Sequence, residues 1–110
     1  MRKAYNLEQL AENRASEVYE DLSTDGQSFE WLQENDSMLA SQLINDAMDC
    51  LIDEIKSRGF KWLNLLMPLA SAETIEEDLE YYGGELLTKR YKRYIKGLKW
   101  KNKHWLNLKQ

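Results

Sequence analysis

Hydrophobic residues recur every three or four positions along most of this chain, which is the spacing of one face of an α-helix. The first such pattern covers residues 7–22, where Asn6 is placed to cap a helix and residues 23–26 supply turn-forming side chains. Its apolar positions are Leu7, Leu10, Ala11, Ala15, Val18, Tyr19 and Leu22. The pattern predicts an amphipathic helix whose apolar stripe faces a core.

A stronger apolar pattern marks a central helix, which follows a short helical turn at residues 29–33 that Ser28 opens. Asp36 or Ser37 is placed to cap the central helix, and Gly59 stands where a left-handed residue is expected to end it. Its apolar positions are Leu39, Leu43, Ile44, Ala47, Met48, Leu51, Ile52 and Ile55. Because they share one face, we expect this helix to form the centre of the core.

The chain's single proline, Pro68, predicts a break after the apolar run 60–67. Proline disfavours helix at the residue before it and has no backbone N–H to donate. Ser71 or Thr74 then opens another helix, and Thr74 with Glu77 matches a capping box. We therefore expect a separate helix after the proline.

The last clear helix is predicted from residue 85 to about residue 98, after Gly83 and Gly84 stop the preceding one. Residues 100–108 form a further turn or an extended tail. Leu87, Tyr91, Tyr94, Ile95 and Leu98 share one face of this last helix. With no alternating strand pattern and no repeat, the sequence predicts an all-α fold: a single small domain over residues 1–110, with four to five helices and a basic, aromatic C-terminal helix and tail.

Charge is divided sharply along the chain. All 19 acidic residues lie between Glu8 and Glu85, whereas residues 89–110 hold no acid and nine basic residues. The formal net charge of −4 is therefore the sum of −13 over residues 1–88 and +9 over the rest, with His104 neutral. We expect an acidic body over residues 1–84 and a basic element over 85–110.

Residues that support catalysis or metal binding are scarce. One histidine, His104, and one cysteine, Cys50, exclude the common zinc sites. Cys50 lies beside the central apolar stripe, so we expect a buried or half-buried structural thiol. Asp46, Asp49 and Asp53 share a helix face and could bind a divalent ion, although a solvated polar face is the favoured interpretation. We expect no enzyme and no cofactor.

The location of the protein is predicted from its apolar segments and its cysteine content. The chain starts without the apolar segment of a secretory signal. Its longest apolar-rich stretch, residues 60–72, is too short and too interrupted to span a bilayer. A lone cysteine suits a reducing compartment. We expect a cytosolic protein without membrane contact.

The basic segment is the first candidate binding site. Its expected contact residues are Lys89, Arg90, Lys92, Arg93, Lys96, Lys99, Trp100, Lys101, Lys103 and Trp105. Cations would neutralise phosphates and aromatic rings would stack on unpaired bases, which favours nucleic acid. Two alternatives stay open: the apolar residues are core and the lysines solvated, or the segment docks on a negative patch of a protein partner.

The apolar segment around Pro68 is the second candidate site. Trp62, Leu63, Leu66 and Met67 form either the middle of the core or an exposed patch that anchors a partner. The Met67–Pro68 bond is in turn either a substrate for a prolyl isomerase or a trans bond in an ordinary turn.

A short all-helical chain with a single proline in Leu66-Met67-Pro68-Leu69 resembles the phage Abc-type anti-RecBCD proteins. The resemblance implies a phage protein in the host cytosol that binds the RecC subunit of the RecBCD nuclease, alters its response to Chi and protects phage DNA. It also implies contact with a host prolyl isomerase through Met67, Pro68 and Leu69. The alternatives are a small nucleic-acid-binding protein that uses residues 89–105 and an inhibitor that mimics nucleic acid by its acidic charge.

Overall fold

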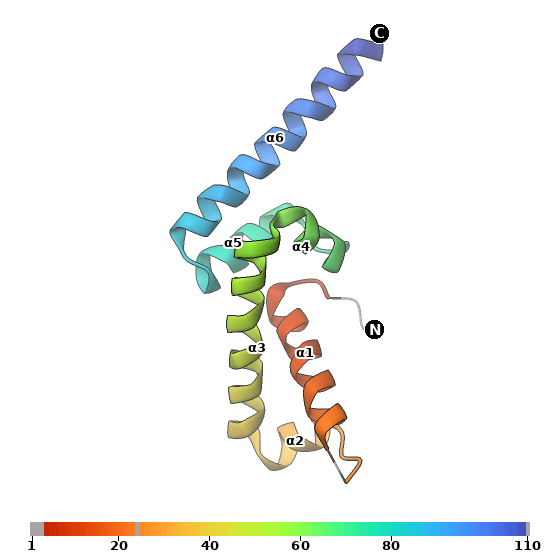
Figure 1. Cartoon of the computed structure of the whole chain (residues 1–110), viewed down its shortest axis with the longest axis vertical. Coiled ribbons are helices and arrows are strands. Elements are labelled where there is room, and N and C mark those ends of the chain that lie inside the picture. Colours follow the sequence, from red (N-terminus) through yellow and green to blue (C-terminus); the bar gives the residue numbers. More distant parts are fainter. Residues whose placement is uncertain (1–3, 24, 110) are drawn as a thin grey trace. The chain divides into compact units, whose positions relative to one another are not determined.

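The computed structural model confirms an all-α protein. It describes the backbone of residues 4–23 and 25–109, and the side chains of residues 4–23 and 25–98. Over this part of the chain there are six helices and no strand: α1 (Leu7–Leu22), α2 (Phe29–Asn35), α3 (Ser37–Arg58), α4 (Phe60–Leu66), α5 (Ala72–Tyr82) and α6 (Glu85–Lys109) (Figure 1). The prediction of four to five helices is too low, because the short segments at residues 29–35 and 60–66 each form a helix of their own.

The chain divides into two compact units, Met1–Ala70 and Ser71–Gln110. The first unit contains α1 to α4, and the second contains α5 and α6. The boundary between the units therefore does not lie where the charge changes sign, and the acidic helix α5 belongs with the basic helix α6. The expectation of a single domain over residues 1–110 stays a prediction.

In the first unit, α1 and α3 lie side by side and run in opposite directions, and α2 connects them at one end (Figure 1). A core cluster here comprises Ala15, Phe29, Leu32 and Ala40, with Tyr19, Leu43, Ile44 and Ala47 packed against it. The Tyr19 and Phe29 rings meet edge to face, with their centres 6.2 Å apart. This aromatic contact fastens α2 to α1.

Local capping sets the starts of α1, α2 and α3, as the sequence predicts. Asn6, Ser28 and Asp36 each accept a hydrogen bond from the backbone N–H three residues later, at 2.8, 3.2 and 3.2 Å. Each bond satisfies one of the N–H groups that a helix start leaves without a partner. Gly59 has φ +90° and ψ −177°, a conformation that glycine adopts without strain, and it separates α3 from α4.

In the second unit, α5 and α6 pack on each other as a helical hairpin. Ser71 caps α5, since its Oγ accepts a hydrogen bond from the N–H of Thr74 at 3.1 Å. The predicted Thr74–Glu77 capping box is therefore wrong, because Thr74 lies inside the first turn. Gly84 has φ +89° in the connection that the two glycines were predicted to form.

The last helix is longer than predicted. Its backbone is helical from Glu85 to Lys109, so the segment expected to be a turn or an extended tail continues α6. No helix in the described part of the chain combines the length and the apolar character that crossing a membrane requires.

Candidate binding surfaces

The cations and aromatic rings that alternate in the sequence separate onto different faces of α6. The side chains of Lys89, Arg90, Lys92, Arg93 and Lys96 are exposed, whereas Leu87, Thr88 and Tyr91 are buried. Tyr94 and Ile95 are half-buried. The helical period explains the separation, because residues three or four apart share a face. These five exposed cations are called the cationic face of α6 below.

Carboxylates of the second unit offset part of this charge. Lys92 pairs with Glu76 of α5 at 3.2 Å, and Lys89 pairs with Glu85 one turn earlier at 3.2 Å. Each pair is largely solvated, so each contributes about 0–1 kcal/mol. The cationic face is therefore held in place partly by the acidic helix packed against it.

Tyr91 anchors α6 from the opposite side. Its side chain is 1% exposed, and its ring stacks on Tyr94 with centres 6.4 Å apart. Burial raises the pKa of the Tyr91 hydroxyl above its usual value of 10.0, and the nearby Tyr94 and Glu76 raise it further. Tyr91 is thus a core residue, and only its solvent-facing neighbours are placed to meet a partner.

The remaining predicted contact residues of the basic segment lie outside the residues whose side chains are described: Lys99, Trp100, Lys101, Lys103 and Trp105, together with His104. Their backbone belongs to α6.

The predicted isomerase-contacting segment is split by burial. Pro68 is exposed and Leu69 is 45% exposed, whereas Met67 is 1% exposed. The Met67–Pro68 bond is trans, and the N–H of Ala70 donates to the carbonyl of Met67 at 3.2 Å, which closes a turn. Met67 therefore anchors the turn, and the turn presents Pro68 and Leu69; contact of these three residues with an isomerase stays a prediction.

The three residues of the predicted apolar patch differ in burial, and their contact with a partner stays a prediction. Leu63 is 0% exposed, because it shares the inward face of α4 with the buried Phe60. Leu66 is half-buried. Trp62 is half-buried as well, and the guanidinium carbons of Arg14 and Arg58 lie 5.7 and 5.4 Å from its ring centre. These cation–π contacts occupy the ring within the first unit.

The cysteine and the three aspartates that the sequence singled out on α3 all have exposed side chains. Cys50 is exposed, not buried, because it is turned about 100° from the buried Leu51 that follows it. Asp46, Asp49 and Asp53 are exposed. Among the described residues, no group of three or more His, Cys, Asp or Glu side chains could hold a metal ion.

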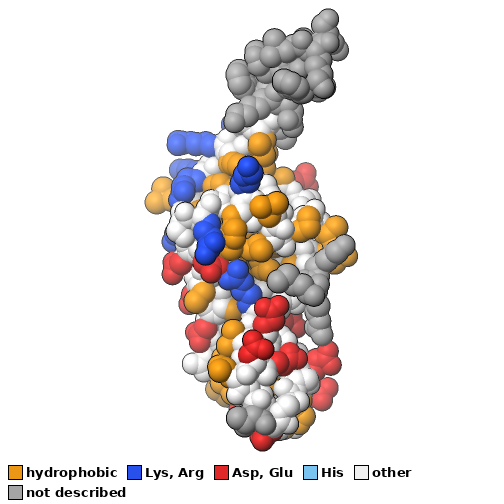
Figure 2. Space-filling view, turned by 45° about the vertical axis from the view of Figure 1, so that its right-hand side comes forward, with side chains coloured by type: hydrophobic (Ala, Val, Ile, Leu, Met, Phe, Trp, Pro, Cys, Tyr) orange, Lys and Arg blue, Asp and Glu red, His pale blue; other side chains and the backbone are white. Residues whose placement is uncertain are grey.

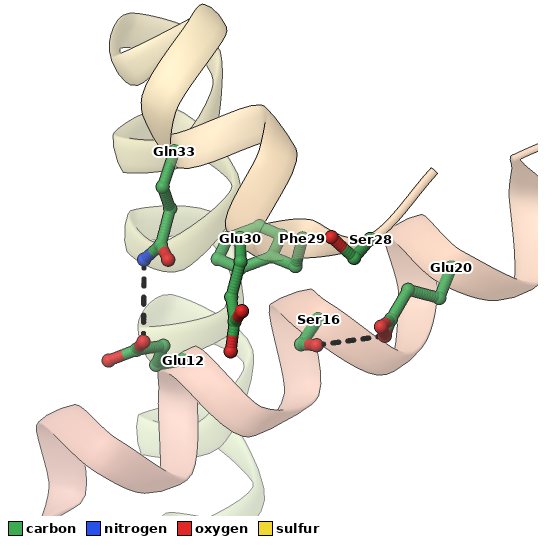
Figure 3. Close-up of a pocket in the computed structure, with 7 residues that line it drawn as sticks. All are labelled: Glu12, Ser16, Glu20, Ser28, Phe29, Glu30 and Gln33. Carbon is green, nitrogen blue, oxygen red and sulfur yellow. Dashed lines mark hydrogen bonds between the residues drawn. The ribbon is translucent and has the colours of Figure 1, made fainter. Parts of the chain in front are cut away.

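A polar pocket of about 220 Å³ lies between α1 and α2. It is lined by Glu12, Ser16, Glu20, Ser28, Phe29, Glu30 and Gln33 (Figure 3). The Gln33 side-chain amide donates to Glu12 at 3.3 Å, and the Ser16 hydroxyl donates to Glu20 at 3.1 Å. Figure 3 also shows Glu30 pointing from α2 toward α1. Three carboxylates, those of Glu12, Glu20 and Glu30, make the lining acidic, so the pocket attracts cations rather than anions.

A second concavity, which is apolar, lies between α1 and α3. Reasoning from the sequence found neither concavity, because both depend on how α1 packs against its neighbours. Val18 lines the apolar one and belongs to the predicted core stripe of α1, yet its side chain is 54% exposed. Comparisons with protein-family models, with curated proteins and with solved structures found no match.

Proposed function

We propose that the protein is a non-enzymatic modulator that binds the host RecBCD nuclease through its RecC subunit and changes the Chi-dependent activity of that nuclease. The observation that carries the proposal is the turn after α4, where a buried Met67 presents Pro68 and Leu69 to solvent. This is the segment on which the resemblance to the Abc-type proteins rests. A small helical protein that offers binding surfaces would act on a nuclease by docking rather than by chemistry of its own.

Binding is tested with purified components. The tagged chain is mixed with RecBCD at near-physiological salt, and the retained subunits and the Chi-dependent nuclease activity are measured. We expect RecC to be retained and degradation of linear DNA to change. If no RecBCD subunit is retained, the proposal is wrong.

The proline is tested separately against a host prolyl isomerase. Pro68→Ala removes the proline from the exposed turn and should abolish association with the isomerase. Leu65→Ala is the matched control, because Leu65 is 75% exposed on the neighbouring helix and lies outside the predicted segment. Equal association of both variants would contradict a role for Pro68 while leaving the RecC test unaffected.

A second candidate function, nucleic-acid binding, is favoured by the cationic face of α6. Five exposed cations within eight residues form a dense positive strip, and binding through such a strip weakens steeply as salt rises. Arg93→Glu with Lys96→Glu should abolish retention on DNA at low salt. Lys56→Glu with Lys61→Glu makes the same charge change in the first unit, and should leave most of the binding intact.

A further inference from the structure

The groove between α1 and α3 is apolar and open to solvent. It has a volume of about 360 Å³ and is lined by Arg14, Ala15, Val18, Leu43, Asp46, Ala47 and Cys50. Val18 is 54% exposed, and Leu43 and Ala47 are only partly buried. The first unit therefore leaves apolar side chains uncovered along the line where its two main helices meet.

The borders of this groove are acidic. Asp46 lines it directly, and the exposed Asp21 and Asp53 lie one helical turn from Val18 and Cys50 on the same sides of α1 and α3. The one cation in the lining, Arg14, is paired with Glu54. On the face of the first unit that Figure 2 shows, acidic and hydrophobic side chains lie next to one another.

An apolar groove with acidic borders favours some binding partners over others. A nucleic acid or an anionic membrane would be repelled by the carboxylates. A second copy docked through the same groove would bring identical carboxylates together, because a two-fold contact pairs like surfaces. A partner that complements the groove must instead be apolar along one stripe and basic beside it.

The dimensions of the groove favour a helix. It is lined from residue 14 to 18 on α1 and from 43 to 50 on α3, and eight helical residues span about 12 Å. A helix of two to three turns matches this length, and laying its apolar face in a groove between two helices is a recurring mode of recognition. We infer that the groove between α1 and α3 binds a basic amphipathic helix of a partner protein. The residues that line this groove are different from those of the Pro68 turn and of the cationic face of α6.

The first test measures affinity for a synthetic probe. The probe is an amphipathic peptide of about four helical turns with leucines on one face and lysines on the rest. Saturable binding to the full-length protein is expected, and Val18→Lys should weaken it about tenfold, as for the loss of a contact worth about 1.4 kcal/mol. Met38→Lys adds the same charge at a position that is 84% exposed and away from the groove by helical period, and should have little effect. Absence of saturable binding, or equal weakening by both variants, would overturn the inference.

The acidic border is tested with a second matched pair. Asp46→Asn should weaken peptide binding several-fold, because its carboxylate lines the groove, and the loss should shrink as salt rises. Glu34→Gln removes one negative charge at an exposed position of α2, no residue of which lines the groove, and should have a smaller effect. If both substitutions weaken binding equally, the peptide responds to the net charge of the protein and does not bind in this groove, which contradicts the inference.

The single cysteine provides a readout that needs no substitution. Cys50 lines the groove and is exposed, so it is open to an alkylating reagent. Saturating peptide should slow its alkylation several-fold, whereas a peptide with glutamates in place of the lysines should not. An unchanged rate at saturating lysine peptide would show that the peptide binds elsewhere, which also overturns the inference.

Discussion

In the first unit, uncompensated carboxylates lie beside an apolar groove, whereas in the second unit an acidic helix and a basic helix pack on each other. Residues 1–70 hold 13 acidic and six basic residues, a net charge of −7, and residues 71–110 hold six acidic and nine basic residues, a net charge of +3. The difference shows that a boundary in charge is not a boundary in packing. The acidic α5 belongs with the basic α6, and Glu76 of α5 pairs with Lys92 of α6.

The two units consequently suit different partners. The acidic first unit offers its groove to a basic, apolar helix, while the cationic face of α6 suits an anionic surface. Each surface can be disabled without changing the other, since the residues that form them lie on different helices.

The largest expected effect concerns the cores. Phe29→Ala should destabilise the first unit by about 3–5 kcal/mol, since its ring is 3% exposed in the cluster that joins α1, α2 and α3. Leu79→Ala, at a position in α5 that is 0% exposed, should cost the second unit about 2–5 kcal/mol. Urea denaturation followed by circular dichroism measures both. Leu22→Ala is the control: the side chain is 77% exposed, and a change above about 0.5 kcal/mol there would contradict the described packing.

Substitutions at the N-terminal cap of α5 should change stability less than those in the cores. Ser71→Ala should cost about 0.5–2 kcal/mol, because it removes the acceptor for the Thr74 N–H, and Ser71→Asp should retain most of the stability. Thr74→Ala should cost less, because Thr74 lies inside the helix. Thermal unfolding compares the three variants. A larger loss from Thr74→Ala would restore the capping box that the sequence suggested.

Alkaline pH should weaken the second unit. The pKa of Tyr91 is raised in the folded chain, so above pH 10 the unfolded chain loses this proton first, and stability falls as pH rises toward the folded pKa. The contribution is fully present below pH 10. Unfolding measured between about pH 8 and 11 should show a shallower fall for Tyr91→Phe. Tyr81→Phe, at a side chain that is 82% exposed, should keep the wild-type profile.

The smallest expected effect compares one ion pair from each unit. Lys92–Glu76 and Arg14–Glu54 are both partly solvated, so double-mutant cycles should give couplings of about 0.2–1 kcal/mol. The Arg14 pair should couple more strongly, because its side chains are 30% and 34% exposed, against 55% and 38% for the Lys92 pair. A larger coupling for Lys92–Glu76 would show that charge, rather than burial, dominates at the α5–α6 contact.

Local signals were enough to predict most helix boundaries from the sequence. Asn6, Ser28 and Gly59 cap or end helices through contacts within one helical turn, so these boundaries can be predicted without knowledge of the fold. The exception is instructive: Ser71 and Thr74 both match a cap, and the start of α5 at Ala72 assigns the role to Ser71.

The candidate surfaces were predicted less well. The period of a helix states which residues share a face, but not how much of that face a neighbour covers. The sequence left open whether the segment before Pro68 is core or an exposed patch, and the structure buries Leu63 and Met67 while it exposes Pro68 and Leu69. Burial decides whether an apolar residue is a core position or a contact, and neighbouring helices decide burial.

The sequence by itself therefore determined an all-α chain, the positions of most of its helices and the separation of its acidic and basic residues, because these depend on periodicity, capping and composition. It did not show α4 or the full length of α6. The tertiary structure decided which apolar side chains are covered. Val18 and Leu22 belong to the predicted stripe of α1 but remain exposed, and Cys50 opens onto the same groove as Val18. The physical reason is that α1 and α3 cover each other along only part of their apolar faces, and the uncovered part becomes a surface.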